Sequence, residues 1–242
     1  MPHGAPDDSD VVKRGDNYRL DDMAELAARL GSPVTFHRFG DVVWIDTFET
    51  GLGGWVVGAT DPASVVYLQG DNCMMGGCAV EIASAAEDPE YARIAKGYTY
   101  EVGTRIGFGT CYAINGDSTN LTLQILYRDG VHAFAGTIRI THSSGLVEYV
   151  DDIGDRVTLG NVGLLDVTGV IWYPIKLIVD TNTGTYVGFT FGSHQFNMTD
   201  IAMLSTVSAL APMCSANLQY RCADALAHSL YIDNCVFTVN EF

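Results

Sequence analysis

The sequence predicts an all-β protein: a two-sheet antiparallel sandwich preceded by an N-terminal extended arm and a short helix. Three observations predict this class. From Pro33 onward, apolar and polar residues alternate at the two-residue period of strands. Turns rich in Gly, Asn and Asp separate about a dozen such runs. No helix-length segment lies between them, unlike in the βαβ alternation of parallel sheets. We therefore divide the chain into residues 1–32, an attachment segment, and residues 33–242, the sandwich.

The attachment segment combines an arm with a helix. Residues 1–20 are rich in charge and have no periodicity, as expected of an extended arm. Apolar residues then recur at helical spacing up to Gly31, which ends the helix, while Asp21 and Asp22 cap its N-terminus. This amphipathic helix either packs on its own domain or docks on a neighbouring subunit, and the sequence leaves both open.

Four stretches predict strands most clearly: residues 34–48, 120–142, 170–191 and 228–239. The first is a hairpin that turns at Phe39, Gly40 and Asp41. In the second, two strands flank a turn, and each has an apolar face opposite a polar one. The polar positions there are Thr122, Gln124, Arg128, Thr137, Arg139 and Thr141. Residues 199–227 hold either strands or a short helix.

Charge limits the partners that this chain can bind. With 13 basic and 29 acidic residues, the formal net charge is −16. Such a surface repels phosphate backbones and anionic lipids, so we expect neither nucleic-acid nor membrane binding. No apolar run approaches the ~20 residues of a membrane helix, and the polar, acidic start shows no secretory signal peptide.

Six cysteines are too few for a disulfide scaffold in a chain of this length. Cys73 and Cys78 are close enough in sequence to staple a turn, which makes them the candidate disulfide. Cys214 and Cys222 are a second, weaker pair. The spacing of neither pair matches a zinc knuckle, and six cysteines allow ~15 pairings, so the connectivity stays open.

Motifs that would identify an enzyme are absent. The sequence has no G-x-S-x-G elbow, no H-E-x-x-H and no Walker-type phosphate loop. The histidines are scattered; His132 and His142 flank one predicted strand, and we expect them to be surface or strand-end residues. We therefore predict a protein that is not an enzyme, with no catalytic residues and no required cofactor.

Two features would serve a sugar site. The carboxylates of Glu148, Asp151 and Asp152 are of the type that cleaves glycosidic bonds. However, Glu148 and Asp151 are an odd number of residues apart and point to opposite faces of a strand, so a solvated strand end is the alternative. Trp44, Trp55 and Trp172 would stack on sugar rings if exposed, or fill the core if buried.

Three segments together resemble a known family. Residues 46–55 (DTFETGLGGW) resemble the opening of jelly-roll carbohydrate-binding modules and related concanavalin-A-like domains. Residues 176–186 resemble their K-L-x-V-D hairpin, and residues 230–236 their closing Y-I-D strand. The resemblance implies a jelly roll whose first and last strands are neighbours. It also implies a structural calcium ion held by Glu49 and Asp233, unless these carboxylates only cap turns.

The arm, the helix and the following strand resemble the front ends of jelly-roll proteins encoded among tailed-phage structural genes. This likeness implies a virion component, either a capsid decoration or a tail-associated protein, attached through residues 1–32 to other virion proteins or to copies of itself. We expect it in the virion, assembled in the host cytoplasm. The alternative is an extracellular carbohydrate-binding module that grips host or environmental glycans.

Overall fold

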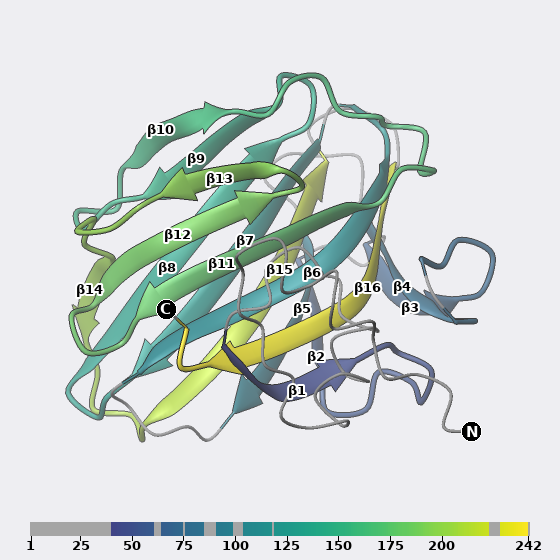
Figure 1. The fold of residues 1–242 in the computed structure, drawn as a ribbon. Coiled ribbons are helices and arrows are strands. Elements are labelled where there is room, and N and C mark those ends of the chain that lie inside the picture. The colour runs from purple at the N-terminus through teal and green to yellow at the C-terminus, as the bar shows by residue number, and fades with distance from the viewer. Residues whose placement is uncertain are drawn as a thin grey trace, which may run out of the picture.

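The computed structural model describes residues 40–60, 64–74, 76–84, 91–98, 104–117, 119–222 and 228–241, and the structural statements below concern these residues. They form sixteen strands and no helix. None of them belongs to a helix of the length and apolarity that crossing a membrane requires. The strands build two antiparallel sheets that pack face to face as a jelly-roll sandwich, which confirms the predicted fold class (Figure 1). The predicted arm and helix, and the first strand of the hairpin around Phe39, lie outside the described residues.

The first layer, sheet A, contains the last strand of the chain near its middle. In spatial order its strands are β13 (His194–Asn197), β12 (Thr185–Phe191), β11 (Tyr173–Asp180), β6 (Arg105–Asn115), β16 (His228–Val239), β4 (Ala79–Ser84) and β3 (Val65–Gln69). A further strand, β1 (Asp41–Asp46), pairs with β16 beside this path.

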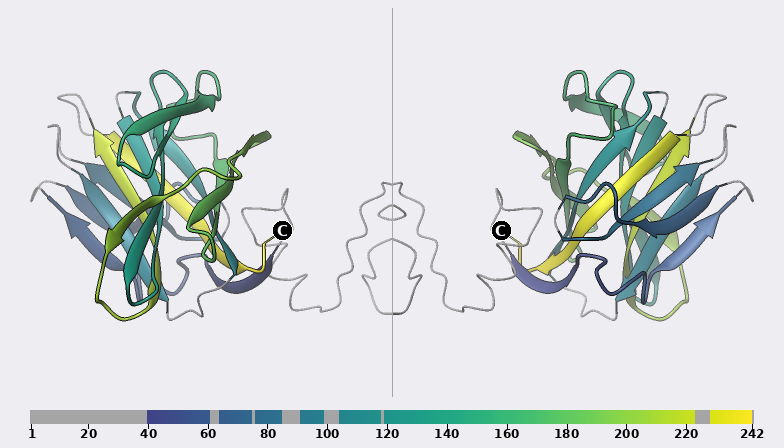
Figure 2. Two further views of the ribbon diagram at one scale, coloured as in Figure 1. Left: turned by 90° about the vertical axis from the view of Figure 1, so that its left-hand side faces the viewer. Right: turned by 90° about the vertical axis from the view of Figure 1, so that its right-hand side faces the viewer.

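The second layer, sheet B, lies behind sheet A in Figure 1, and the two side views of Figure 2 show the layers separately. In spatial order its strands are β10 (Arg156–Asn161), β9 (Leu146–Val150), β8 (His132–Thr141), β7 (Thr119–Arg128), β15 (Met213–Cys222), β5 (Ala92–Tyr98) and β2 (Val56–Ala59). The short strand β14 (Leu204–Val207) pairs with β8 beside this path.

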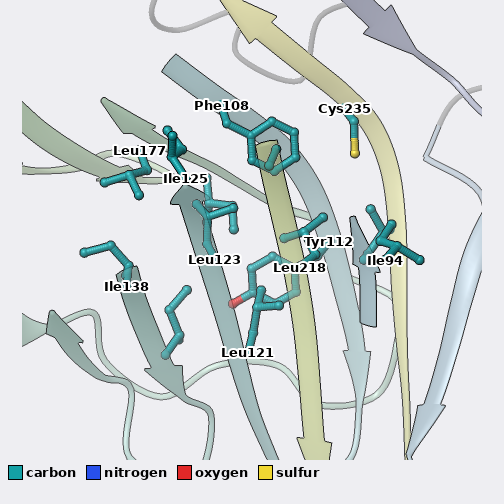
Figure 3. Packing of buried hydrophobic residues seen from close by; sticks show 14 of the residues in the cluster. Ile94, Phe108, Tyr112, Leu121, Leu123, Ile125, Ile138, Leu177, Leu218 and Cys235 are labelled. Carbon is teal, nitrogen blue, oxygen red and sulfur yellow. The ribbon is translucent and has the colours of Figure 1, made fainter. Parts of the chain in front are cut away.

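The core lies between the two sheets, because each strand turns its alternate apolar residues inward. In β7 the predicted apolar face, which includes Leu121, Leu123 and Ile125, is fully buried. Figure 3 shows these side chains in the space between the sheets, with Phe108 and Leu177 of sheet A beside the Ile125 end of the row. Full burial of each such side chain contributes about 1.5–3 kcal/mol, so this face alone fixes how the two sheets stack.

The first and last strands are neighbours, as the family resemblance implies. β1 runs antiparallel to β16, with Asp46 opposite Cys235 (Figure 1). Asp46 also organises the turn that follows: its carboxylate accepts hydrogen bonds from the Phe48 N–H at 2.8 Å and from Trp55 Nε1 at 2.9 Å. The opening of the motif, residues 46–55, is therefore a structural element of the sandwich end.

Residues 199–227, which the sequence left ambiguous, form β14 and β15 where they are described. In β15, Cys214, Ala216 and Leu218 are buried alternately, as a strand requires. The strand count exceeds the expected dozen because the sandwich also has edge strands of four or five residues, namely β2, β3, β13 and β14.

Sheet A buries an ion pair on its outward side. Lys176 of β11 pairs with Glu241, and both side chains are almost fully buried. The same carboxylate accepts a hydrogen bond from the Thr238 hydroxyl. Gly107 of β6 leaves room for the pair, since a Cβ there would lie 2.7 Å from Glu241 Oε1 and 2.8 Å from Lys176 Cε. A glycine is therefore required at this position.

Candidate functional site

The outward side of sheet B carries a contiguous set of polar side chains. Because the apolar residues of β7 and β8 point into the core, the residues between them point away from it. We call this surface the polar face. It consists of Arg93 (β5), Asn217, Gln219 and Arg221 (β15), Asn120, Thr122 and Gln124 (β7), Thr137 and Arg139 (β8), and Glu148 (β9).

Strand register arranges the polar face in rows that cross the sheet. One row contains Arg93, Gln219, Thr122, Arg139 and Glu148, each directly opposite the next on neighbouring strands. Neighbouring strands lie ~4.8 Å apart, so this row extends over ~19 Å. That length suits an extended ligand lying across the strands.

The next row lies two residues along the strands and consists of two amides and a hydroxyl, those of Asn217, Gln124 and Thr137. Gln124 Nε2 donates to Thr137 Oγ1 at 3.0 Å, and Asn217 Nδ2 donates to Gln124 Oε1 at 3.5 Å. The other amide atom, Asn217 Oδ1, is buried and accepts no hydrogen bond within the described part of the chain. A buried acceptor without a donor costs about 1–3 kcal/mol.

Asn120 lies next to the row that contains Thr122 and Arg139, on the side away from Gln124. Its Oδ1 accepts hydrogen bonds from Arg139 Nε at 3.2 Å and from Thr141 Oγ1 at 2.9 Å. These contacts hold the Arg139 guanidinium against the sheet. The polar face is thus partly ordered by its own hydrogen bonds, and this lowers the entropic cost of binding a ligand there.

A smaller polar cluster lies on the outward side of sheet A. Glu81 of β4 accepts a hydrogen bond from Ser229 Oγ at 2.6 Å and lies between Tyr67 and Tyr231 in the register of the sheet. A hydrogen bond with Glu81 raises the pKa of Tyr67 to about 12. The phenols are thus un-ionised at neutral pH, and the cluster offers one carboxylate, fewer groups than the polar face.

The two calcium candidates accept hydrogen bonds from backbone N–H groups of the same loop, those of Met74, Gly77 and Cys78. Glu49 Oε1 accepts hydrogen bonds from the N–H groups of Gly77 at 2.7 Å and Cys78 at 3.1 Å. Asp233 Oδ2 accepts one from the Met74 N–H at 3.0 Å. Both carboxylates thus already accept N–H groups of the loop, and the described residues contain no cluster of three or more metal-binding side chains. These contacts do not fit a calcium cage, and the ion stays a prediction without structural support.

This geometry leads to a first test. Because Glu49 and Asp233 face N–H donors, we expect the same melting temperature in calcium and in a chelator, as measured by thermal denaturation followed by circular dichroism. A saturable rise of several degrees with calcium would instead show that a cation replaces these hydrogen bonds.

The candidate disulfide pair belongs to the same loop. Cys73 and Cys78 are thiols in the structure. Burial raises the pKa of the Cys73 thiol, and the charges of Asp233 and neighbouring groups, Cys78 among them, raise it further. A thiol held in its protonated form reacts slowly with oxidants. The disulfide between them stays a prediction.

Other residues considered from the sequence have structural roles. Asp151 caps the turn after β9 by accepting hydrogen bonds from the N–H groups of Ile153 and Asp155. Trp44 and Trp55 pack at the end of the sandwich around Lys96, whose Nζ lies 3.9 Å from the Trp44 ring centroid. They offer no open platform for a sugar ring.

His142 differs from the expectation of a surface residue. It is almost completely buried, with Nδ1 3.0 Å from the Thr119 carbonyl oxygen and Nε2 3.2 Å from the Tyr112 hydroxyl. Burial lowers the pKa of this imidazole to about 4. His142 continues the inward period of Ile138 and Ile140, a sequence signal that would have identified it as a core residue.

Sequence reasoning found half of the polar face. The alternation within residues 120–142 separated Thr122, Gln124, Thr137 and Arg139 from the core. It missed the residues on β5 and β15, because those strands were not recognised. The alternation of apolar Cys214, Ala216 and Leu218 with polar residues is the sequence signal that would have placed Asn217 and Gln219 on the outward face.

Comparisons with known proteins place the fold. No protein-family model matches the chain, and no curated protein matches its sequence. Among solved structures it is similar to an endo-beta-1,4-glucuronan lyase from the fungus Trichoderma reesei, with a TM-score of 0.60 and 13% identity over 82% of this chain and 95% of the other.

Two further structures have the same architecture. A carbohydrate esterase from the Shiga toxin-encoding bacteriophage phi24B has a TM-score of 0.54 and 14% identity over 84% of this chain and 100% of the other. The cellulose induced protein Cip1 has a TM-score of 0.53 and 11% identity over 81% of this chain and 96% of the other. At these identities the similarity establishes the jelly-roll β-sandwich fold.

Proposed function

We propose that this chain is a carbohydrate-binding β-sandwich without catalytic activity, and that its polar face is the saccharide site. The observation that carries the proposal is the row of Asn217, Gln124 and Thr137, whose amides and hydroxyl are held by hydrogen bonds to one another on the outward side of sheet B. Saccharides present many hydroxyls, each able to donate and to accept. Amides and hydroxyls held in fixed rows suit such a ligand, and two of the structurally similar proteins are named for the polysaccharides or carbohydrates on which they act.

The non-enzymatic part of the proposal rests on the kind of side chains present. Glycoside hydrolysis commonly uses two facing carboxylates, whereas the polar face as described contains one, Glu148. Glu148 lies opposite Arg139 across the β8–β9 register, with no second carboxylate facing it among the described strand positions of the polar face. Binding without turnover is therefore the function that this face supports best.

Binding to a glycan panel, followed by titration calorimetry with the best ligand, tests the proposal. We expect Gln124→Ala and Asn217→Ala each to weaken binding about 5-fold, since each removes hydrogen bonds worth about 1 kcal/mol. Gln195→Ala on β13 of sheet A is the matched control and should bind as the unchanged protein does.

Two results would overturn the proposal: no saturable binding to any glycan, or equal losses in the polar-face variants and in Gln195→Ala. Release of reducing sugar from a bound ligand would overturn the non-enzymatic part alone. Unfolding curves of each variant separate lost contacts from lost structure.

Attachment to a virion through residues 1–32 stays a prediction, because these residues lie outside the described part of the chain. The similarity to a bacteriophage esterase concerns the fold of the sandwich. Self-association and virion localisation likewise stay predictions. Purified particles, tested for this protein and its copy number, would decide between a virion component and a separate glycan-binding protein.

A further inference from the structure

The two sheets carry opposite charge, although the whole chain has a formal net charge of −16. The strands of sheet B contain a single acidic residue, Glu148, against five outward-pointing arginines: Arg93, Arg128, Arg139, Arg156 and Arg221. The strands of sheet A show the reverse, with five acidic residues against Arg105 and Lys176. The basic charge of the sandwich is therefore gathered on one outward surface.

Three of these arginines surround the centre of the polar face, and we call them the arginine triangle: Arg93, Arg139 and Arg221. Arg93 and Arg139 lie in the same row, three strand spacings or ~14 Å apart. Arg221 lies two residues along β15 from Gln219, the residue that faces Arg93. Gln219 and Thr122 lie between Arg93 and Arg139 in this row, and Asn120 lies opposite Arg221 on β7. The three arginines together extend over more than one sugar ring.

Contacts with neighbouring residues position two of the three guanidinium groups, those of Arg93 and Arg139. Arg93 crosses towards β2, where its Nε lies 3.0 Å from the position that a Cβ on Gly58 would take. Its guanidinium carbon lies 5.9 Å from the centre of the Tyr91 ring. Arg139 donates to Asn120, as described above. Placed donors of this kind bind planar anions with little loss of side-chain entropy.

We infer that the ligand of the polar face is an anionic polysaccharide that carries carboxylates, a polyuronate. The inference rests on the proposed function and adds the charge of the ligand to it. Arginine forks match the geometry of carboxylates, and the amide row beside them matches sugar hydroxyls. A nucleic acid fits less well, because the strand positions of the polar face offer no aromatic side chain on which a base would stack.

Polygalacturonate and its methyl ester provide a matched pair of ligands, since they share a backbone and differ in charge. We expect the full-length protein to bind polygalacturonate at least about 10-fold more tightly than the ester, with the difference shrinking at high salt. Arg93→Gln and Arg221→Gln should each lower the affinity for polygalacturonate about 5- to 10-fold relative to the unchanged protein. The affinity of each variant for the ester should stay within about 2-fold of that of the unchanged protein. Arg156→Gln, on the edge strand β10, removes the same charge outside the triangle, and this variant should bind polygalacturonate as tightly as the unchanged protein does.

The outcomes separate this inference from the proposed function. Equal binding of acid and ester, with losses in Gln124→Ala but none in the arginine variants, would overturn the inference and retain the saccharide site. Absence of binding to both polymers and to every panel glycan would overturn both. Equal affinity for a single-stranded oligonucleotide, lost in the same arginine variants, would show a general polyanion surface and overturn the polysaccharide assignment.

Discussion

Replacing Lys176 with methionine is expected to lower the free energy of unfolding by about 3–5 kcal/mol. The substitution keeps the length and apolar volume of the side chain but leaves the carboxylate of Glu241 buried without its counter-charge. Thr238 donates one hydrogen bond to this carboxylate, and its second oxygen, Oε2, has no hydrogen-bond partner in the described structure. A single hydroxyl does not offset the loss of a cation. Urea denaturation followed by tryptophan fluorescence measures the change.

The double variant Lys176→Met, Glu241→Gln is the control for this prediction. Because it removes both charges, it should recover part of the stability lost in Lys176→Met. A loss in the double variant as large as the sum of the two single losses would show that the ion pair contributes nothing. Arg105→Met supplies a second comparison: its ion pair with Asp180 is more exposed and should be worth about 1 kcal/mol or less.

His142 is expected to make the protein less stable by about 3 kcal/mol at pH 4 than at pH 7, apart from the contribution of the carboxylates. Its pKa is about 4 in the folded protein because of burial, against about 6.5 in the unfolded chain. Between these values the unfolded chain binds a proton that the folded protein does not. The contribution of His142 is therefore complete above pH 6.5 and is lost as the pH falls towards 4.

The variant His142→Gln isolates this effect from the titration of acidic groups. Glutamine retains a donor for the Thr119 carbonyl and an acceptor for the Tyr112 hydroxyl but does not titrate. Free energies of unfolding, measured from pH 7 to pH 4 for both proteins, should converge as the pH falls. Parallel curves over this range would mean that the imidazole is protonated in the folded state.

The sequence predicted the sandwich because its strongest strands are also its most regular. Residues 120–142 alternate without interruption, so their core face, their turn and half of the polar face followed directly from the two-residue period. The pairing of β1 with β16 followed from the resemblance, since it joins segments separated by almost the whole chain.

The rest of the site depends on contacts that no local pattern contains. The inward residues of β15 include the small residues Cys214 and Ala216, which do not by themselves distinguish a strand from a short helix. The polar residues that alternate with them were therefore not recognised as one face of a strand. The row that brings Arg93 beside Gln219 joins strands far apart in sequence. No local pattern predicted the loop N–H groups that face Glu49 and Asp233 either; the calcium ion was implied by the resemblance alone.

The place of β16 in sheet A has a consequence for how the protein is made. This strand bonds to β6, β4 and β1, so residues translated later hold together residues translated early. A growing chain on the ribosome has exposed strand edges until residues 228–239 emerge, and chaperones have this interval in which to bind it. Such long-range closure also places refolding in the range of milliseconds to seconds rather than microseconds.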